Sequence, residues 1–160
     1  MQLLASEHDF ITTLRKALTE IDDKWESYNG LIIPGSHKPN MVDEKIDAIR
    51  NARENKIPAL LICFGHQLGA IEYARNVIGI KDATSEEFSE VGTFVVKKRN
   101  ELNVGLKDGE SYWNNYEVVL QNWKKPDWFV TTQSHPEYQS SKDKPHPILV
   151  YFINLCKKYG

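Results

Sequence analysis

The sequence predicts an α/β protein with an open, mostly parallel β-sheet, flanking helices and a small antiparallel or mixed region in its second half. Two uncharged segments, 30–33 and 59–62, are typical of strands buried on both faces, and helical spacing follows each of them. Strand, helix, strand, helix in this order implies right-handed crossovers between parallel strands. Beyond Gly79 the elements become shorter and are separated by polar turns, with expected strands at 93–96, 102–106, 116–120 and 128–133.

Apolar residues at helical spacing predict three helices besides the one that follows segment 59–62, over residues 7–21, 43–56 and 147–158. Ser6 is a preferred N-cap for the first of them. Dense charge opposite the apolar side of the second predicts a solvated outer face. Pro147 suits the first position of the third. The residues before Ser6 are too few to predict a strand.

The composition is that of an ordinary globular protein and argues against several functions. With 160 residues, 41% of them hydrophobic and 26% charged, we expect one domain over 1–160. A net charge of −2 gives no basic surface for nucleic acid or an anionic membrane. Neither a long apolar run nor a signal-peptide pattern is visible, and two cysteines make no disulfide framework, so we expect a cytoplasmic protein. No cluster has metal-ligand spacing, and we expect neither a metal nor a cofactor.

The clearest functional signal lies in residues 58–76. An uncharged strand ends at Cys63, and helical spacing starts at once, which is the arrangement of a nucleophile elbow. Free N–H groups and the positive end of the helix dipole favour a thiolate at such a position. Gly65 lets the backbone approach a neighbouring strand or a substrate. We therefore expect Cys63 to be a nucleophile, whereas Cys156 is expected to be a buried apolar residue.

A candidate base and its orienting group follow at the end of the last expected strand. In an extended His-x-Glu stretch both side chains point to the same side, so Glu137 can hold one ring nitrogen of His135 while the other faces the thiol. This predicts a catalytic triad in which the sulfur of Cys63 lies within hydrogen-bonding reach of the imidazole.

An oxyanion hole is the third requirement of such chemistry. The backbone N–H of Phe64, next after the nucleophile, is one natural donor. The turn at Gly35 and Ser36, after the first buried strand, is the candidate for the second.

Together these segments resemble the class I glutamine amidotransferases, whose triad is Cys, His and Glu. Residues 63–67 match the family motif C-x-G-x-Q in full, and residues 135–137 match H-P-E. Residues 54–88 are similar over their whole length to the glutaminase domain of CTP synthase. The resemblance implies a flavodoxin-like sheet, attack of the thiol on the side-chain amide of glutamine, release of ammonia, and hydrolysis of a γ-glutamyl thioester. It also implies that Phe64 and Gln67 contact the bound glutamine and that Glu87 meets its α-amino group.

The sequence departs from the family pattern in two places. Residues 34–38 read Pro-Gly-Ser-His-Lys where the family has Pro-Gly-Gly-Phe-Gly, and Asn115 replaces the arginine that helps to hold glutamine. By its position in the resemblance, Asn115 is expected to contact the substrate together with Gln67 and Glu87. No segment resembles the ATP-dependent synthase half, and the first strand of the family looks short. Our first hypothesis is a glutaminase that supplies ammonia to a separate synthetase subunit. A hydrolase of another γ-glutamyl amide and a non-catalytic regulatory or binding module are the alternatives.

Overall fold

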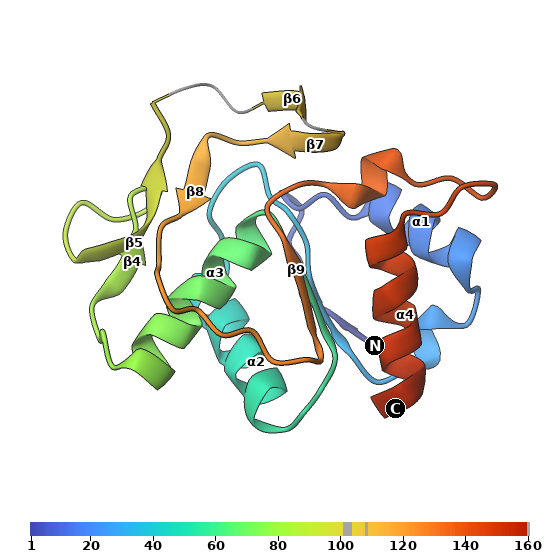
Figure 1. Ribbon diagram of the computed structural model, residues 1–160, viewed down its shortest axis with the longest axis horizontal. Helices are drawn as coiled ribbons and strands as arrows, with labels where there is room; N and C mark the ends of the chain where they lie inside the picture. Colours follow the sequence, from blue (N-terminus) through green and yellow to red (C-terminus); the bar gives the residue numbers. More distant parts are fainter. Residues whose placement is uncertain (101–103, 108, 160) are drawn as a thin grey trace.

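The main β-sheet is parallel, as the sequence predicts. The computed structural model describes residues 1–100, 104–107 and 109–159 (Figure 1). Its four parallel strands lie in the order β1 (Gln2–Leu3), β2 (Leu31–Ile33), β3 (Ala59–Ile62) and β9 (Phe129–Thr132). The residues before Ser6 therefore do form a strand, contrary to expectation. A strand of two residues is too short to show a strand pattern in the sequence. β1 forms because its backbone pairs with that of β2.

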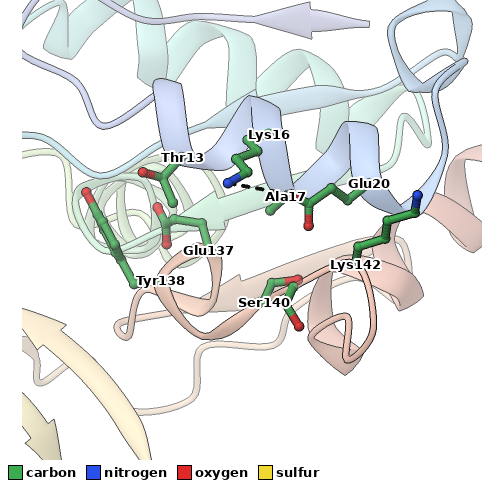
Figure 2. A pocket seen from close by; sticks show the side chains of 9 residues that line it. Thr13, Lys16, Ala17, Glu20, Glu137, Tyr138, Ser140 and Lys142 are labelled. Atoms are coloured by element: carbon green, nitrogen blue, oxygen red, sulfur yellow. Dashed lines mark ion pairs between the residues drawn. The ribbon is translucent and has the colours of Figure 1, made fainter.

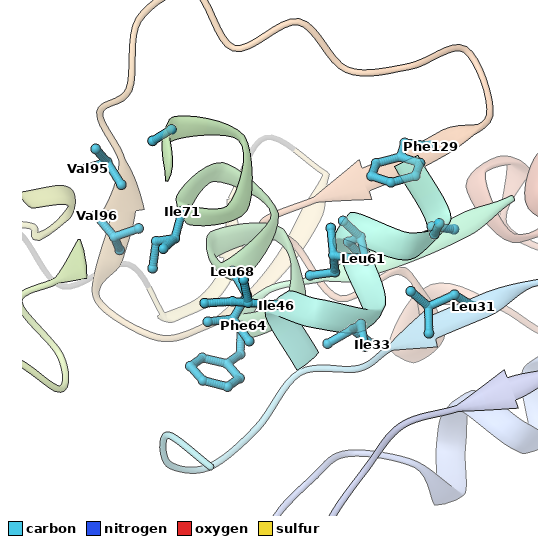
Figure 3. Packing of buried hydrophobic residues seen from close by; sticks show 14 of the residues in the cluster. Leu31, Ile33, Ile46, Leu61, Phe64, Leu68, Ile71, Val95, Val96 and Phe129 are labelled. Atoms are coloured by element: carbon cyan, nitrogen blue, oxygen red, sulfur yellow. The ribbon is translucent and has the colours of Figure 1, made fainter. Parts of the chain in front are cut away.

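Helices cover both faces of this sheet (Figure 1). α2 (Val42–Glu54) and α3 (Phe64–Tyr73) lie on one face, and α1 (Thr12–Ile21) and α4 (Pro147–Tyr159) lie on the other. Alternate strand residues serve the two cores: Ile33 and Leu61 pack against α2 and α3 (Figure 3), whereas Ile32 and Leu60 pack against α1 and α4. Burial on both faces explains why these strands are uncharged.

The start of α1 and one residue of α2 differ from expectation. α1 begins at Thr12 rather than near residue 7, because residues 6–9 form a turn in which Ser6 Oγ accepts from the His8 N–H at 3.2 Å and the Ser6 N–H donates to Asp9 Oδ2 at 2.8 Å. Asp9 in turn forms a salt bridge of 2.8 Å with Lys45, and both side chains are fully buried. Lys45 therefore does not belong to a solvated helix face, although it lies in a highly charged segment.

The second half forms a small mixed sheet and a hairpin. β4 (Ala83–Ser85) pairs parallel with β5 (Thr93–Lys98), which pairs antiparallel with β8 (Tyr116–Val118). The hairpin joins β6 (Val104–Lys107) to β7 (Glu110–Trp113) and runs across one end of the molecule (Figure 1). Part of the strand expected at 102–106 lies outside the described residues. β4 and β7 were not expected, because short polar segments carry no strand pattern.

Short helical turns complete the chain. They are η1 (Trp25–Ser27), the π-helical turn η2 (Ala74–Ile78), which ends at Gly79 with φ of +93°, and η3 (Pro136–Gln139). Within the described ranges, no helix has the length and apolar character needed to cross a membrane.

Candidate active site

Cys63 occupies a sharp elbow between β3 and α3. Its backbone adopts φ +52° and ψ −101°, a conformation that non-glycine residues rarely take and that functional sites often impose. Gly65 lets the start of α3 lie close to β2, since a Cβ at that position would lie 2.3 Å from the carbonyl oxygen of Ile33. The structure thus confirms the strand–elbow–helix arrangement and shows which neighbouring strand requires the glycine.

Sheet register brings the predicted nucleophile and base to the same edge. Ile62 of β3 pairs with Thr132 of β9, and the N–H of Cys63 donates to the Thr132 carbonyl at 2.8 Å. Cys63 and His135 therefore both follow the carboxyl ends of neighbouring parallel strands, where open α/β sheets bind ligands. The backbone N–H of His135 donates to the carbonyl of Ser111 in β7 at 2.7 Å, so the hairpin also holds this segment.

His135 and Glu137 interact, although their backbone is not extended as expected. Glu137 lies in the first turn of η3, and its Oε2 is 3.3 Å from His135 Nδ1, with both side chains fully buried. The other carboxylate oxygen, Oε1, has no hydrogen-bond partner among the described residues. Glu137 also lines a cleft between α1 and the segment after η3, with Thr13 and Lys142 among the other lining residues (Figure 2).

The imidazole of His135 is packed on three sides. The Phe10 ring meets it edge to face at 5.3 Å between centroids, and the Tyr138 ring lies 5.9 Å away. Gly35 approaches so closely that a Cβ there would lie 2.3 Å from His135 Cε1. This packing fixes the ring, and its Nε2 is buried without a hydrogen-bond partner in the part of the chain that the structure describes.

The thiol of Cys63 is held by amides rather than by the imidazole. Its Sγ accepts hydrogen bonds from Asn114 Nδ2 at 3.0 Å and from Gln133 Nε2 at 3.4 Å. The predicted hydrogen bond between this sulfur and His135 is therefore not made. Burial raises the pKa of the Cys63 thiol, the negative charges of Glu87 and Glu137 raise it further, and the backbone N–H of Phe64 and the Asn114 amide oppose this shift.

The candidate oxyanion loop is fixed to the N-terminal segment. The N–H of Phe10 donates to the Gly35 carbonyl at 2.9 Å, and Ser36 forms an antiparallel bridge with Asp9. In a trans peptide the Ser36 N–H points opposite to the Gly35 carbonyl, and so away from residue 10. Asn40 Nδ2 donates to Ser36 Oγ at 2.8 Å and further restrains the loop.

Two predicted substrate contacts lie at the site, and the third has another partner. Gln67 Oε1 and Glu87 Oε2 are buried without a hydrogen-bond partner among the described residues. Burial raises the pKa of Glu87 to about 7. Asn115 Nδ2 instead donates to the Arg99 carbonyl at 3.1 Å, so its contact with a substrate remains only a prediction.

Asn114 and Gln133 are site residues that sequence reasoning did not find. Weak signals existed, because Asn114 immediately precedes the Asn115 that we singled out, and Gln133 is the last residue of the last expected strand.

His66 lies in a structural environment rather than at the sulfur. Its Nδ1 is 3.0 Å from Thr131 Oγ1. Burial, together with the charge of Lys125, lowers the pKa of His66 to about 3. Among the described residues, no group of three or more His, Cys, Asp or Glu side chains is placed to hold a metal ion.

The fold and the site together define an α/β protein with a cysteine nucleophile elbow and a neighbouring His–Glu pair. Comparison with known families agrees with this class, because residues 7–125 match the family described as glutamine amidotransferase class-I. The chain belongs to the class I glutamine amidotransferase family, whose members are glutamine-hydrolysing enzymes. The match ends before His135, so the role of that residue rests on the geometry described above.

Similar proteins place the chain near one branch of the family. It is 32% identical to CTP synthase of Methanoculleus marisnigri, over 90% of this chain and 39% of that protein. It is 31% identical to CTP synthase of Bdellovibrio bacteriovorus, over 81% and 35%. The chain therefore spans less than two fifths of the length of these relatives. The Trypanosoma brucei CTPS glutaminase domain with bound acivicin shares the fold, with a TM-score of 0.76, 20% identity, and coverage of 91% of this chain and 87% of that one.

Proposed function

We propose that this chain hydrolyses the side-chain amide of glutamine, with Cys63 as nucleophile, His135 as general base and acid, and Glu137 as the group that orients the imidazole. The observation that carries the proposal is the convergence of a cysteine elbow and a buried His–Glu pair at the ends of two paired strands. The elbow positions the sulfur, and Glu137 keeps one ring nitrogen occupied so that the other is available.

The proposed chemistry uses side chains and backbone N–H groups at this edge of the sheet. His135 Nε2, which is buried and unpartnered among the described residues, takes the thiol proton as the sulfur attacks the amide carbon. The oxyanion that forms would accept hydrogen bonds from the backbone N–H of Phe64 and from the Gly35–Ser36 turn. The imidazolium then gives its proton to the leaving nitrogen, and ammonia departs. Water attacks the resulting γ-glutamyl thioester, and glutamate and the free thiol are restored.

The sulfur and the imidazole must come together for this reaction. Their hydrogen bond is not formed here, and catalytic hydrogen bonds often tighten only when the substrate is bound. The backbone N–H of Cys63 is held by the carbonyl of Thr132 in β9, and that of His135 by the carbonyl of Ser111 in β7. We propose that rotation of the Cys63 side chain brings the sulfur to the imidazole when the substrate binds.

The α-amino group of the substrate has a matching environment. Gln67 and Glu87 each have a buried oxygen with no protein partner among the described residues. Gln67 is linked to the Cys63 sulfur through Gln133, and the charge of Glu87 acts on that sulfur. An ammonium group has three donors and no acceptor, so it complements both oxygens. Binding it would also favour the charged form of Glu87, whose pKa burial raises to about 7.

A second candidate function is hydrolysis of another γ-glutamyl amide. The observation that favours it is Asn115, which stands where the family has an arginine and donates to the Arg99 carbonyl. The α-carboxylate of glutamine thus has no assigned cation at that position. A substrate with a larger group on the amide nitrogen would use the same triad.

We further propose that the ammonia is used by a separate synthetase subunit. The relatives named above are CTP synthases of which this chain covers less than two fifths, so the acceptor reaction would lie in other residues. Both thiols are free, which suits the reducing cytoplasm we propose for the protein.

The test is glutamate release from glutamine and from a panel of γ-glutamyl alkylamides. We expect release from at least one of them, and Cys63→Ser should lower the rate by about 10⁴-fold or more. Acivicin, the ligand bound in the T. brucei domain, should add one mass increment to the peptide that carries Cys63. The matched control is Cys156→Ala, which should still be labelled at Cys63. If the protein neither releases glutamate nor is labelled at Cys63, the non-catalytic module is favoured.

A further inference from the structure

We propose that Asn114 and Gln133 form a hydrogen-bond clamp on the Cys63 sulfur that stabilises its thiolate, and that Asn114 is a catalytic residue because it contacts the reacting atom. The proposal rests on the glutaminase function proposed above and deepens it, since it assigns a role to residues outside the triad. Asn114 follows directly after β7, and Gln133 follows directly after β9. Two loops far apart in the sequence therefore meet at the sulfur.

The orientation of the Asn114 amide is fixed by its own hydrogen bonds. Its Oδ1 accepts from the backbone N–H of Tyr116 at 3.1 Å and from Gln133 Nε2 at 3.2 Å. Both partners are donors, so an oxygen must occupy that position. The NH₂ group of Asn114 is therefore the one that faces Cys63 Sγ at 3.0 Å.

Gln133 extends the clamp into a one-way chain of amides. Its Oε1 accepts from Gln67 Nε2 at 3.2 Å, and its Nε2 donates both to Asn114 Oδ1 and to the sulfur, at 3.2 and 3.4 Å. Donation thus runs from Gln67 through Gln133 and Asn114 to Cys63. Hydrogen bonds aligned in one direction polarise each other, so the Asn114 N–H that faces the sulfur carries an enhanced partial positive charge.

The charges around the sulfur make such donors necessary. Glu87, from the loop after β4, and Glu137, from η3, both disfavour a thiolate, and the imidazole of His135 lies at the same edge of the sheet. Burial acts in the same direction as the two carboxylates, and the Phe64 N–H acts against them. A hydrogen bond to a charged acceptor typically shifts the pKa of that acceptor by about one to two units. Loss of the Asn114 donor should therefore raise the pKa of the Cys63 thiol measurably.

The test is the rate of alkylation of Cys63 by iodoacetamide as a function of pH, with no substrate present. Peptide mass spectrometry separates the alkylation of Cys63 from that of Cys156, whose side chain is fully buried. The informative variant is Asn114→Asp, because it keeps the size of the side chain and the oxygen that accepts from Tyr116. Asn115→Asp is the matched control, since it adds the same charge one residue away, at a side chain that bonds to Arg99.

We expect Asn114→Asp to slow alkylation of Cys63 by about 10- to 100-fold at a given pH below the titration midpoint, which corresponds to a rise of about one to two pKa units. Asn114→Ala should act in the same direction, and Asn115→Asp should have a much smaller effect. An unchanged or faster rate in a folded Asn114→Asp variant, or equal effects of the two Asp variants, would overturn the proposal.

Glutamate release, measured in parallel, separates this proposal from the proposed function. If the parent protein releases no glutamate from any γ-glutamyl amide while Asn114→Asp slows alkylation, the function fails and the thiolate clamp stands. If the parent releases glutamate while Asn114→Asp leaves the alkylation profile unchanged, the clamp alone fails.

Discussion

Replacing Lys45 by methionine should destabilise the fold by about 3–5 kcal/mol, the usual cost of removing one partner of a buried ion pair. The ammonium of Lys45 lies 2.8 Å from Asp9 Oδ2 and 2.9 Å from Asn40 Oδ1, and both charged side chains are fully buried. Methionine has a similar volume, so the cost comes from the uncompensated carboxylate rather than from a cavity. Asp9 then retains neutral donors, from Ser6, Ser36 and Asn40.

The double variant Asp9→Asn/Lys45→Met identifies the cause. It removes both charges, so it should be more stable than Lys45→Met alone, since well-packed neutral replacements of buried pairs are often tolerated.

The pH dependence of the parent's stability gives a second check. Burial raises the pKa of Asp9, but hydrogen bonds from Lys45, Ser36, Ser6 and Asn40 outweigh it and leave the pKa below its usual value. The parent therefore keeps this stabilisation above about pH 4 and loses it as pH falls through the lower, folded-state pKa.

Urea unfolding followed by tryptophan fluorescence measures these free energies. The matched control is Lys16→Met, because Lys16 is exposed and its ammonium lies 3.9 Å from Glu20, so we expect a change within about 0.5 kcal/mol. In Lys45→Met the destabilisation should shrink on acidification, because protonation neutralises Asp9. A loss below about 1 kcal/mol at neutral pH, or a double variant no more stable than the single one, would refute the assignment.

Three further predictions concern the site. Gly35→Ala should lower the rate of glutamate release by about 100-fold, because the new Cβ would lie 2.3 Å from His135 Cε1 and displace the imidazole; an unchanged kcat would contradict this. Glu87→Gln should raise the KM for glutamine. Burial raises the pKa of Glu87 to about 7 in the folded protein, so the parent loses stability as pH rises from about 4.5 to 7. The variant should therefore have a higher melting temperature than the parent at about pH 8 but not at about pH 4. Gly65→Ala should lower the free energy of unfolding by about 1–3 kcal/mol or more, since its Cβ would meet the Ile33 carbonyl; an unchanged urea midpoint would exclude that clash.

The parallel sheet and the elbow could be predicted because their causes are local. A strand buried on both faces must be uncharged, and residues 30–33 and 59–62 show this directly. The start of α1 could not be predicted, because Ser6 and Asp9 form a pattern that also fits a helix cap. Lys45, which lies 36 residues beyond Asp9, decides between the two structures by requiring that carboxylate as a buried partner. A local window of sequence contains no information about this pairing.

The positions of the proposed triad follow from the same strand pattern, but the hydrogen bonds of the Cys63 sulfur do not. Strand ends predicted from sequence place Cys63 and His135 at one edge, and the register of β3 with β9 agrees. What surrounds the sulfur depends on the turn after β7, where neighbouring residues point in different directions. Asn114 therefore donates to Cys63, whereas Asn115 donates to the Arg99 carbonyl. Sequence reasoning compared residue types along the chain and singled out Asn115, whereas only the conformation of the turn determines that Asn114 is the side chain that reaches the thiol.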